Sequence, residues 1–146
     1  MNKFSTAGQG SGPECECCPT GRLETRFIPE TIEHESEGGT IAIQADRVPV
    51  SVCDTCGSVF ITGETAKARH EYVCRAVGAI TPAEIKALRE RHGLSQHDLS
   101  RIAGFGEASI SRWERGRLLP SPSNSKFLKV LLQHPQIVES LLGPQT

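Results

Sequence analysis

The front part of the chain alternates apolar and polar residues, which is typical of strands with one buried face. Residues 23–27, 40–44 and 48–52 each follow this alternation. Residues 38–39 are both glycine and predict a turn between the first two runs. Because Pro49 has no backbone N–H, we expect its strand to lie at the edge of a sheet. The pattern predicts a small antiparallel sheet.

A helical pattern replaces the strand pattern after Gly63. Gly78 is the signal that ends this helix, so we expect it to cover residues 64–77. The helix links the front half of the chain to the back half. Its apolar stripe is predicted to contain Ala66, Tyr72, Val73 and Val77.

The rest of the chain predicts five short helices. Thr81 and Ser95 each begin a capping box, because Glu84 and Asp98 follow three residues later. A tight turn after the second helix is typical of a helix-turn-helix bundle. The expected helices cover about residues 82–92, 96–103, 107–115, from 122 onward, and 136–142. Their inward positions include Ile85, Leu88, Leu99, Ile102, Ala103, Ile110, Trp113, Phe127, Leu128, Leu131 and Leu132.

Charge divides the 146 residues into unlike halves. Residues 1–79 hold 7 Lys and Arg against 11 Asp and Glu, a net of −4, whereas residues 80–146 hold 9 against 6, a net of +3. This division favours a nucleic-acid module joined to one that avoids nucleic acid. Residues 1–13 are rich in Gly, Ser, Thr and Gln and are expected to be disordered. We find no signal-peptide core and no membrane span, so we expect a cytoplasmic protein with no membrane partner.

Two Cys-x-x-Cys pairs indicate a metal site. Cys15 with Cys18, and Cys53 with Cys56, would supply four thiolates to one structural Zn²⁺ per chain, because each pair forms a tight turn and the hairpin brings the two turns together. A redox disulfide and an iron–sulfur cluster are the alternatives. The sequence lacks the βαβ pattern expected around a redox disulfide. It also lacks a further cysteine motif that would favour an iron–sulfur cluster. Cys17 is left as a spare thiol.

The other candidates near this site are given ordinary structural interpretations. Cys74 lies in the middle of the predicted linker helix and is expected to be a small buried hydrophobe. His34 and His70 are the only further candidate ligands considered, and like His92, His97 and His134 they are interpreted as ordinary surface residues. A site with four thiolates has no open position, which argues against catalysis.

The predicted second and third helices of the back half are suited to binding DNA. The third would lie in the major groove, where Arg112 can pair with a guanine in two hydrogen bonds. Gln96, at the start of the second helix, can donate to a phosphate. Glu107 can accept from a cytosine N4 or simply act as a helix N-terminal charge. The remaining predicted contacts are the small or polar Ala108, Ser109 and Ser111 and the phosphate-binding Arg115 and Arg117.

Residues 94–100 and 110–116 resemble the XRE, lambda-repressor-like helix-turn-helix domain over about residues 80–133. With the cysteine pairs upstream, nearly the whole chain is similar to the MqsA-type (YgiT-type zinc finger) antitoxins. The resemblance implies a zinc domain that holds the toxin and a C-terminal domain that dimerises and represses its own operon. The best-known members carry an Asn where this chain has Ala108, so the operator sequence does not transfer.

The predicted fold is therefore α+β: a small zinc-bound antiparallel β domain over residues 14–62, a linker helix over 63–79, and an all-α lambda-repressor-like domain over 80–146 for DNA binding and dimerisation. The predicted function is an operator-binding repressor that is the antitoxin of a small basic toxin. A stand-alone zinc-finger regulator is the alternative. A thiol redox sensor using Cys17 or Cys74 is another. No nucleophile–base pair or phosphate loop suggests an enzyme.

Overall fold

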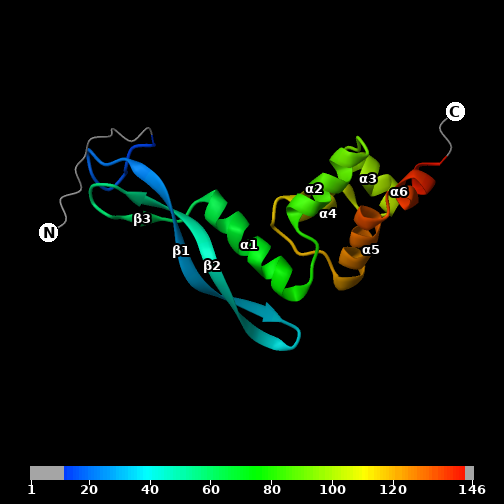
Figure 1. Cartoon of the computed structure of the whole chain (residues 1–146), viewed down its shortest axis with the longest axis horizontal. Helices are drawn as coiled ribbons and strands as arrows, with labels where there is room; N and C mark the ends of the chain where they lie inside the picture. Colours follow the sequence, from blue (N-terminus) through cyan, green and yellow to red (C-terminus); the bar gives the residue numbers. More distant parts are fainter. Residues whose placement is uncertain (1–11, 144–146) are drawn as a thin grey trace.

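The computed structural model describes residues 12–143, so residues 1–11 of the tail predicted to be disordered lie outside the described part. The fold is α+β, as predicted. A three-stranded sheet with one helix forms one end of an elongated molecule, and five helices form the other (Figure 1). In chain order the elements are β1 Leu23–Ser36, β2 Gly39–Cys53, β3 Val59–Phe60, α1 Gly63–Val77, α2 Pro82–Arg91, α3 Gln96–Ala103, α4 Glu107–Glu114, α5 Pro122–Gln133 and α6 Pro135–Leu142.

One long hairpin replaces the separate short strands that the sequence predicts. β1 and β2 pair in antiparallel register along almost their whole length, and the register shifts once, between Ile28 and Glu30. On β2 the buried positions are odd-numbered before this shift and even-numbered after it: Ile43 and Ala45, then Val48 and Val50. The extra residue of a β-bulge moves the alternation by one position. It thereby keeps a single face of β2 buried, although the sequence pattern reads as two strands.

Pro49 lies on the central strand of the sheet, so its predicted place on an edge strand is wrong. Its missing N–H nevertheless costs no hydrogen bond to β3, because β3 pairs only with Ser51 and Val52. The Pro49 carbonyl accepts a hydrogen bond from Thr65 Oγ1 of α1 at 2.5 Å. Since the nitrogen and carbonyl of one strand residue point to the same side, the missing N–H of Pro49 faces α1 and interrupts no pairing with β1.

Helix α1 packs on β2 with a face that matches the predicted one only in part, because Val73 is buried as predicted and Tyr72 is half-buried. Thr65, Val73 and Cys74 are buried, whereas Ala66 and Val77 are exposed. The helix begins at a capping box formed by Thr62 and Thr65. Polar side chains also bind α1 to the hairpin. Arg69 donates to both carboxylate oxygens of Glu30 at 2.6 and 3.0 Å. Tyr72 donates to Asp46 Oδ1 at 2.5 Å and accepts from the backbone N–H of Arg47 at 3.1 Å, at the bulge.

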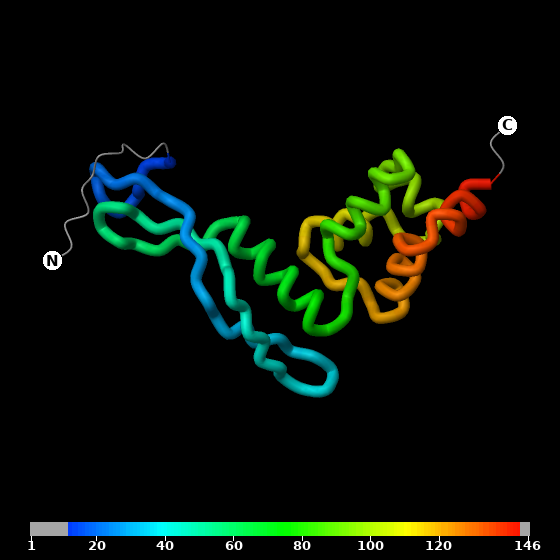
Figure 2. Tube along the Cα trace, in the orientation of Figure 1, coloured from blue at the N-terminus to red at the C-terminus, as the bar shows by residue number. Residues whose placement is uncertain are grey.

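The five C-terminal helices enclose their own apolar core. The capping boxes predicted at Thr81 and Ser95 are present, and they begin α2 and α3. α4 begins at Glu107, and its N-cap residue, Gly106, offers no side-chain cap. The chain trace turns back on itself between successive short helices (Figure 2). The buried members of this core are Ile80, Ile85, Leu88, Leu94, Leu99, Ile110, Trp113, Leu128, Leu131 and Val138.

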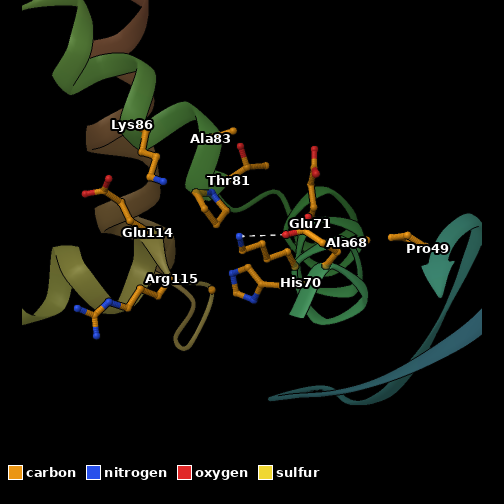
Figure 3. Close-up of a pocket in the computed structure, with 13 residues that line it drawn as sticks. Pro49, Ala68, His70, Glu71, Thr81, Ala83, Lys86, Glu114 and Arg115 are labelled. Atoms are coloured by element: carbon orange, nitrogen blue, oxygen red, sulfur yellow. Dashed lines mark hydrogen bonds and ion pairs between the residues drawn. The ribbon is translucent and has the colours of Figure 1, made fainter. Parts of the chain in front are cut away.

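A short connection joins the two halves. α1 ends at Gly78, whose φ of 72° is left-handed, and Lys129 Nζ of α5 donates to the Gly78 carbonyl at 2.8 Å. A cleft of about 360 Å³ lies beside this connection, lined by residues of β2, α1, α2 and α4 and of the turn that follows α4 (Figure 3). In this cleft the half-buried His70 ring approaches Gly116, where an added Cβ would lie 3.3 Å from the ring. The φ of 71° favours glycine at residue 116, and a larger residue would also have to displace the His70 ring by a few tenths of an ångström.

Candidate metal centre and nucleic-acid interface

Two backbone turns at the far end of the sheet bring the four predicted cysteines together. In the first, the N–H of Cys15 donates to the Gly21 carbonyl at 3.0 Å. In the second, the N–H of Gly57 donates to the Cys53 carbonyl at 3.1 Å, and Gly57 adopts a φ of 73°. Glycine accepts this left-handed conformation without steric cost. The antiparallel pairing of Leu23 with Cys53 then places the first turn directly beside the second.

The sulfur positions fit one tetrahedral metal ion. Cys15 Sγ lies 3.7 Å from Cys56 Sγ, and Cys18 Sγ lies 3.6 Å from Cys53 Sγ. All four sulfurs lie within 4.8 Å of one another. Four sulfurs at about 2.3 Å from a zinc ion would be separated by about 3.8 Å. The group of Cys15, Cys18, Cys53 and Cys56, hereafter the four-cysteine cluster, can therefore hold a metal ion with all of its positions occupied by thiolates.

Backbone N–H groups point at two of these sulfurs. The N–H of Cys17 donates to Cys15 Sγ at 3.3 Å, and the N–H groups of Thr55 and Cys56 donate to Cys53 Sγ at 3.4 Å. Such bonds favour the charged thiolate over the neutral thiol, because the N–H dipole is directed at the negative sulfur. The turns therefore orient these two ligand sulfurs, and at Cys15 the N–H bond offsets part of the effect of burial on the thiol.

Gly21 is part of the site, and the sequence analysis missed it. A Cβ at this position would lie 2.1 Å from Cys53 Sγ and 2.6 Å from Cys18 Sγ. No side chain fits at those distances, so only glycine lets the backbone pass beside the sulfurs. The available signal was the glycine three residues after Cys18, which is the counterpart of Gly57 in the second turn.

The thiols differ in protonation and access. Burial raises the pKa of Cys15 to about 12 and also raises the pKa of Cys18, whereas hydrogen bonds from the side chain and backbone of Ser58 lower the pKa of Cys56 to about 6. Cys17 is exposed and lies outside the cluster. Cys74 is fully buried, and burial raises the pKa of its thiol to about 11. Of the two thiols considered for redox chemistry, only Cys17 is accessible to solvent.

Most of the predicted DNA contacts on α4 share one face, on which Ser111 is half-buried and the others are exposed. At about 100° per residue, Glu107, Ala108, Ser111, Arg112 and Arg115 lie within a sector of about 140°. The opposite side carries Ile110 and Trp113, which are buried. Ser109 falls outside this sector and is half-buried. Arg117 lies in the turn after α4, where its N–H donates to the Arg112 carbonyl at 2.9 Å.

Gln96 lies at the start of α3, and its amide is already hydrogen-bonded. Gln96 Nε2 donates to Glu114 Oε2 at 3.1 Å. Glu114 is buried and also accepts two hydrogen bonds from Arg89, at 3.0 and 2.6 Å. Arg89 in turn donates to the Leu94 carbonyl at 3.1 Å. This network joins α2, α3 and the end of α4, so it fixes the angle at which α4 stands on the bundle. The phosphate contact predicted for Gln96 stays a prediction.

The two candidate sites lie far apart. The four-cysteine cluster is at the tip of the sheet, and α3 and α4 are in the helical half at the other end of the molecule (Figure 1). Within residues 12–143, none of Arg112, Arg115 and Arg117 forms an ion pair with an acidic side chain. Three unpaired cations on and after α4 suit a polyanion. In the described residues no helix is both long enough and apolar enough to cross a membrane.

A four-cysteine module followed by a helix-turn-helix bundle defines a class of protein, the regulators that carry an N-terminal metal site. Residues 14–142 match the family described as the antitoxin component of bacterial toxin-antitoxin systems, MqsA. This match covers most of the chain, and the chain belongs to that family. The family resemblance predicted from the sequence is therefore confirmed.

Individual relatives match shorter stretches. The chain is 36% identical to "Antitoxin MqsA" of Escherichia coli K12 over 62 residues, which are 42% of this chain and 47% of that protein. It is 30% identical over 59 residues to "Uncharacterized HTH-type transcriptional regulator YiaG" of the same strain, covering 40% of this chain and 62% of that one. "Antitoxin HigA-2" of Vibrio cholerae is 27% identical over 62 residues, which are 42% of this chain and 60% of that protein. In each case the chain spans less than two thirds of the relative's length.

Proposed function

We propose that this protein is the antitoxin of a two-gene toxin–antitoxin module and that it represses its own operon as a dimer. The observation that carries the proposal is the joining of the four-cysteine cluster to a helix-turn-helix bundle in one chain of the MqsA family. Each half would serve one partner. The relatives with regulator and antitoxin names support both parts of the role.

The metal in the proposal is zinc, held by the four cysteines as a structural ion. Thiolates are the ligands that structural zinc sites most often use, and the sulfur separations match the tetrahedron that zinc prefers. The ion would take the place of an apolar core for residues 14–22 and 53–60, which bury few large apolar side chains. The protein would therefore need metal for the fold of its sheet end and for no chemical step.

The helical half is proposed to bind double-stranded operator DNA through α4. Arg112 would pair with a guanine, Ser111 would reach a phosphate or a base edge, and Arg115 and Arg117 would bind phosphates. A two-fold dimer would set its two α4 helices about 34 Å apart, or a multiple of that distance. The net charge of +3 on residues 80–146 favours this partner.

The sheet half is proposed to bind a small basic toxin. β1 is an outer strand of the sheet, and its first residue, Leu23, donates to the Pro13 carbonyl at 2.9 Å. Within residues 12–143 the rest of this edge has no strand neighbour and can accept an added strand. Apolar side chains are exposed toward the metal end, among them Phe27, Val59 and Ile61. The net charge of −4 on residues 1–79 favours a basic protein, and toxins that act on RNA tend to be basic because they bind it.

Three variants of the full chain test the two halves separately. Cys53→Ser should lose the metal and the binding of the toxin encoded by the neighbouring gene, while it keeps DNA binding. Arg112→Ala should keep metal and toxin and lose about 1–3 kcal/mol of operator affinity. Gln96→Ala should weaken binding to all DNA sequences alike. Toxin capture that survives Cys53→Ser with a wild-type affinity would contradict the assignment of the toxin to the sheet half.

A second candidate is a stand-alone transcriptional regulator without a toxin. The observation in its favour is the likeness to YiaG, which is named as a transcriptional regulator. Both candidates require DNA binding by α4, so the DNA experiment does not separate them. The neighbouring gene does: a flanking reading frame whose small basic product co-purifies with this chain supports the antitoxin. A chain that binds its operator and captures no product of a flanking gene is the regulator.

A further inference from the structure

A histidine and a glutamate connect the N-terminal ends of α3 and α4. His97 is the second residue of α3, Glu107 is the first residue of α4, and His97 Nδ1 lies 3.1 Å from Glu107 Oε2. Their side chains are 61% and 57% exposed. A pair so accessible to water contributes little to folding stability. The pair lies on the exposed face where α4 begins, so a role in DNA binding is to be considered rather than a role in folding.

Glu107 is the only acidic residue on the exposed face of α4, because the other acidic residue of this helix, Glu114, is buried. Its neighbour Ala108 offers no polar side-chain atom. A carboxylate that faces DNA is repelled by the phosphates. The repulsion is offset where the carboxylate accepts a hydrogen bond from a base, and the N4 amino group of cytosine is the group that acidic side chains read in the major groove.

We propose that His97 is a positioning residue for DNA recognition: it holds the Glu107 carboxylate toward a cytosine N4 amino group, and it carries a proton in the complex. With both ring nitrogens protonated, Nδ1–H donates to Glu107 and Nε2–H can donate to a phosphate oxygen. The inference rests on the proposed function, in which α4 enters the major groove. It adds His97 of α3 to the residues of α4 that recognise a base pair.

The charges around His97 determine the sign of the pH dependence. Asp98 and Arg101 lie beside it on α3, Glu107 faces it from α4, and α6, which also packs on α3, carries Glu139. The Asp98 carboxylate is occupied, because it accepts from the backbone N–H of Ser95 at 3.0 Å, and this bond lowers the pKa of Asp98. Glu107 is thus the acidic group with which the His97 ring interacts directly.

DNA adds a dense negative charge to these surroundings and favours the protonated imidazole. If the complex holds more protons than the free protein, affinity is greatest at low pH and falls as pH rises through the range in which histidine titrates, between about 5 and 8. The fall is at most about tenfold per pH unit for each recognition helix that takes up one proton.

The test uses the full chain loaded with zinc. Binding sites are selected from a random library of duplexes about 20 base pairs long, and the affinity for the selected duplex is measured by fluorescence anisotropy at pH 6, 7 and 8 at constant salt. The wild-type chain should select a C·G pair at one position in each half-site. It should bind about tenfold more weakly at pH 8 than at pH 6.

Three variants separate the two roles of the histidine. His97→Ala should lose both the C·G preference and the pH dependence. His97→Gln keeps an amide N–H for Glu107 and cannot titrate, so it should keep the preference and lose the pH dependence. Glu107→Gln should change the preferred base from cytosine to adenine, which amide side chains read. His134→Gln is the control, because His134 is an exposed histidine at the junction of α5 and α6, and it should behave like wild type.

The outcomes distinguish this inference from the function on which it rests. A wild-type chain that selects no sequence overturns the proposed function and the inference with it. A wild-type chain that selects a sequence, together with a His97→Ala variant that keeps the same base preference and the same pH profile, overturns the inference alone. Equal melting temperatures of the variants show that lost recognition is not lost folding. If Glu107→Gln lowered only the melting temperature, Glu107 would be a helix N-terminal charge.

Discussion

Replacing Gly21 with alanine tests the geometry of the four-cysteine cluster more directly than removing a ligand does. The added Cβ would lie 2.1 Å from Cys53 Sγ and 2.6 Å from Cys18 Sγ, whereas ordinary Cβ contacts begin at 3.4 Å. At least one sulfur would have to move by more than 1 Å. Metal–sulfur distances in such sites tolerate changes of only about 0.2 Å. All four ligands would be present in the variant, and yet they could not surround one ion.

The expected loss in metal affinity follows from this displacement. Removing a group that merely orients a ligand typically costs about 10–100-fold in metal affinity. Gly21→Ala moves the ligand atoms themselves, so we expect a loss of about 100-fold or more. Titration of the reduced protein against a coloured zinc chelator at neutral pH measures the affinity. Circular dichroism should show that the helical half remains folded.

Gly63→Ala is the matched control for this experiment. Gly63 is the first residue of α1, nothing lies within 4 Å of an added Cβ there, and its φ is not left-handed. The control should therefore bind zinc with wild-type affinity. If Gly21→Ala also bound one equivalent of zinc with wild-type affinity, the close approach of the backbone to the sulfurs would be wrong, and so would the tetrahedral assignment.

Three further predictions concern other parts of the chain. Glu114→Gln should destabilise the helical half by about 3 kcal/mol, measured by urea unfolding, because it leaves the partly buried guanidinium of Arg89 without its carboxylate; a loss below about 1 kcal/mol would contradict this. The Tyr72 hydroxyl lowers the pKa of Asp46, so their bond stabilises the fold at pH above 3.8 and loses this effect as pH falls below that value. Tyr72→Phe should accordingly lower the melting temperature more at pH 7 than near pH 2, where only the hydrogen bond from the Arg47 N–H to the Tyr72 hydroxyl is still lost. Cys17→Ser should leave zinc stoichiometry and affinity unchanged, and a loss of zinc would make Cys17 a ligand.

The helix starts could be predicted because their signals are local. A capping box depends on residues three positions apart, and those at Thr81 and Ser95 begin helices in the structure as predicted. The buried face of α1 could not be predicted in the same way. Ala66 and Val77 are apolar and exposed, whereas Thr65 is buried because its hydroxyl donates to the Pro49 carbonyl. That choice of face depends on where β2 lies, which the sequence pattern of the helix does not contain.

In the candidate sites, too, local motifs could be predicted and tertiary contacts could not. The ligand pairs are local motifs, and the structure brings all four cysteines together. Gly21 was missed because its role arises only when Cys53, distant in sequence, comes to lie beside it. His97 was interpreted as an ordinary surface residue because its partner Glu107 is ten residues away on another helix. Residues that act through a tertiary contact leave little trace in a single sequence.

The two halves carry separate cores, and this determines how damage at one end reaches the other. The C-terminal core closes around Ile80, whose N–H donates to the Ser125 hydroxyl at 3.3 Å, and the helices from α2 onward supply its other members. The four-cysteine cluster adds nothing to that core, because it lies at the opposite end of the sheet (Figure 1). Loss of metal should therefore unfold the sheet end first and leave α4 in place. Under the proposed function, loss of metal should therefore abolish toxin binding and leave operator binding intact.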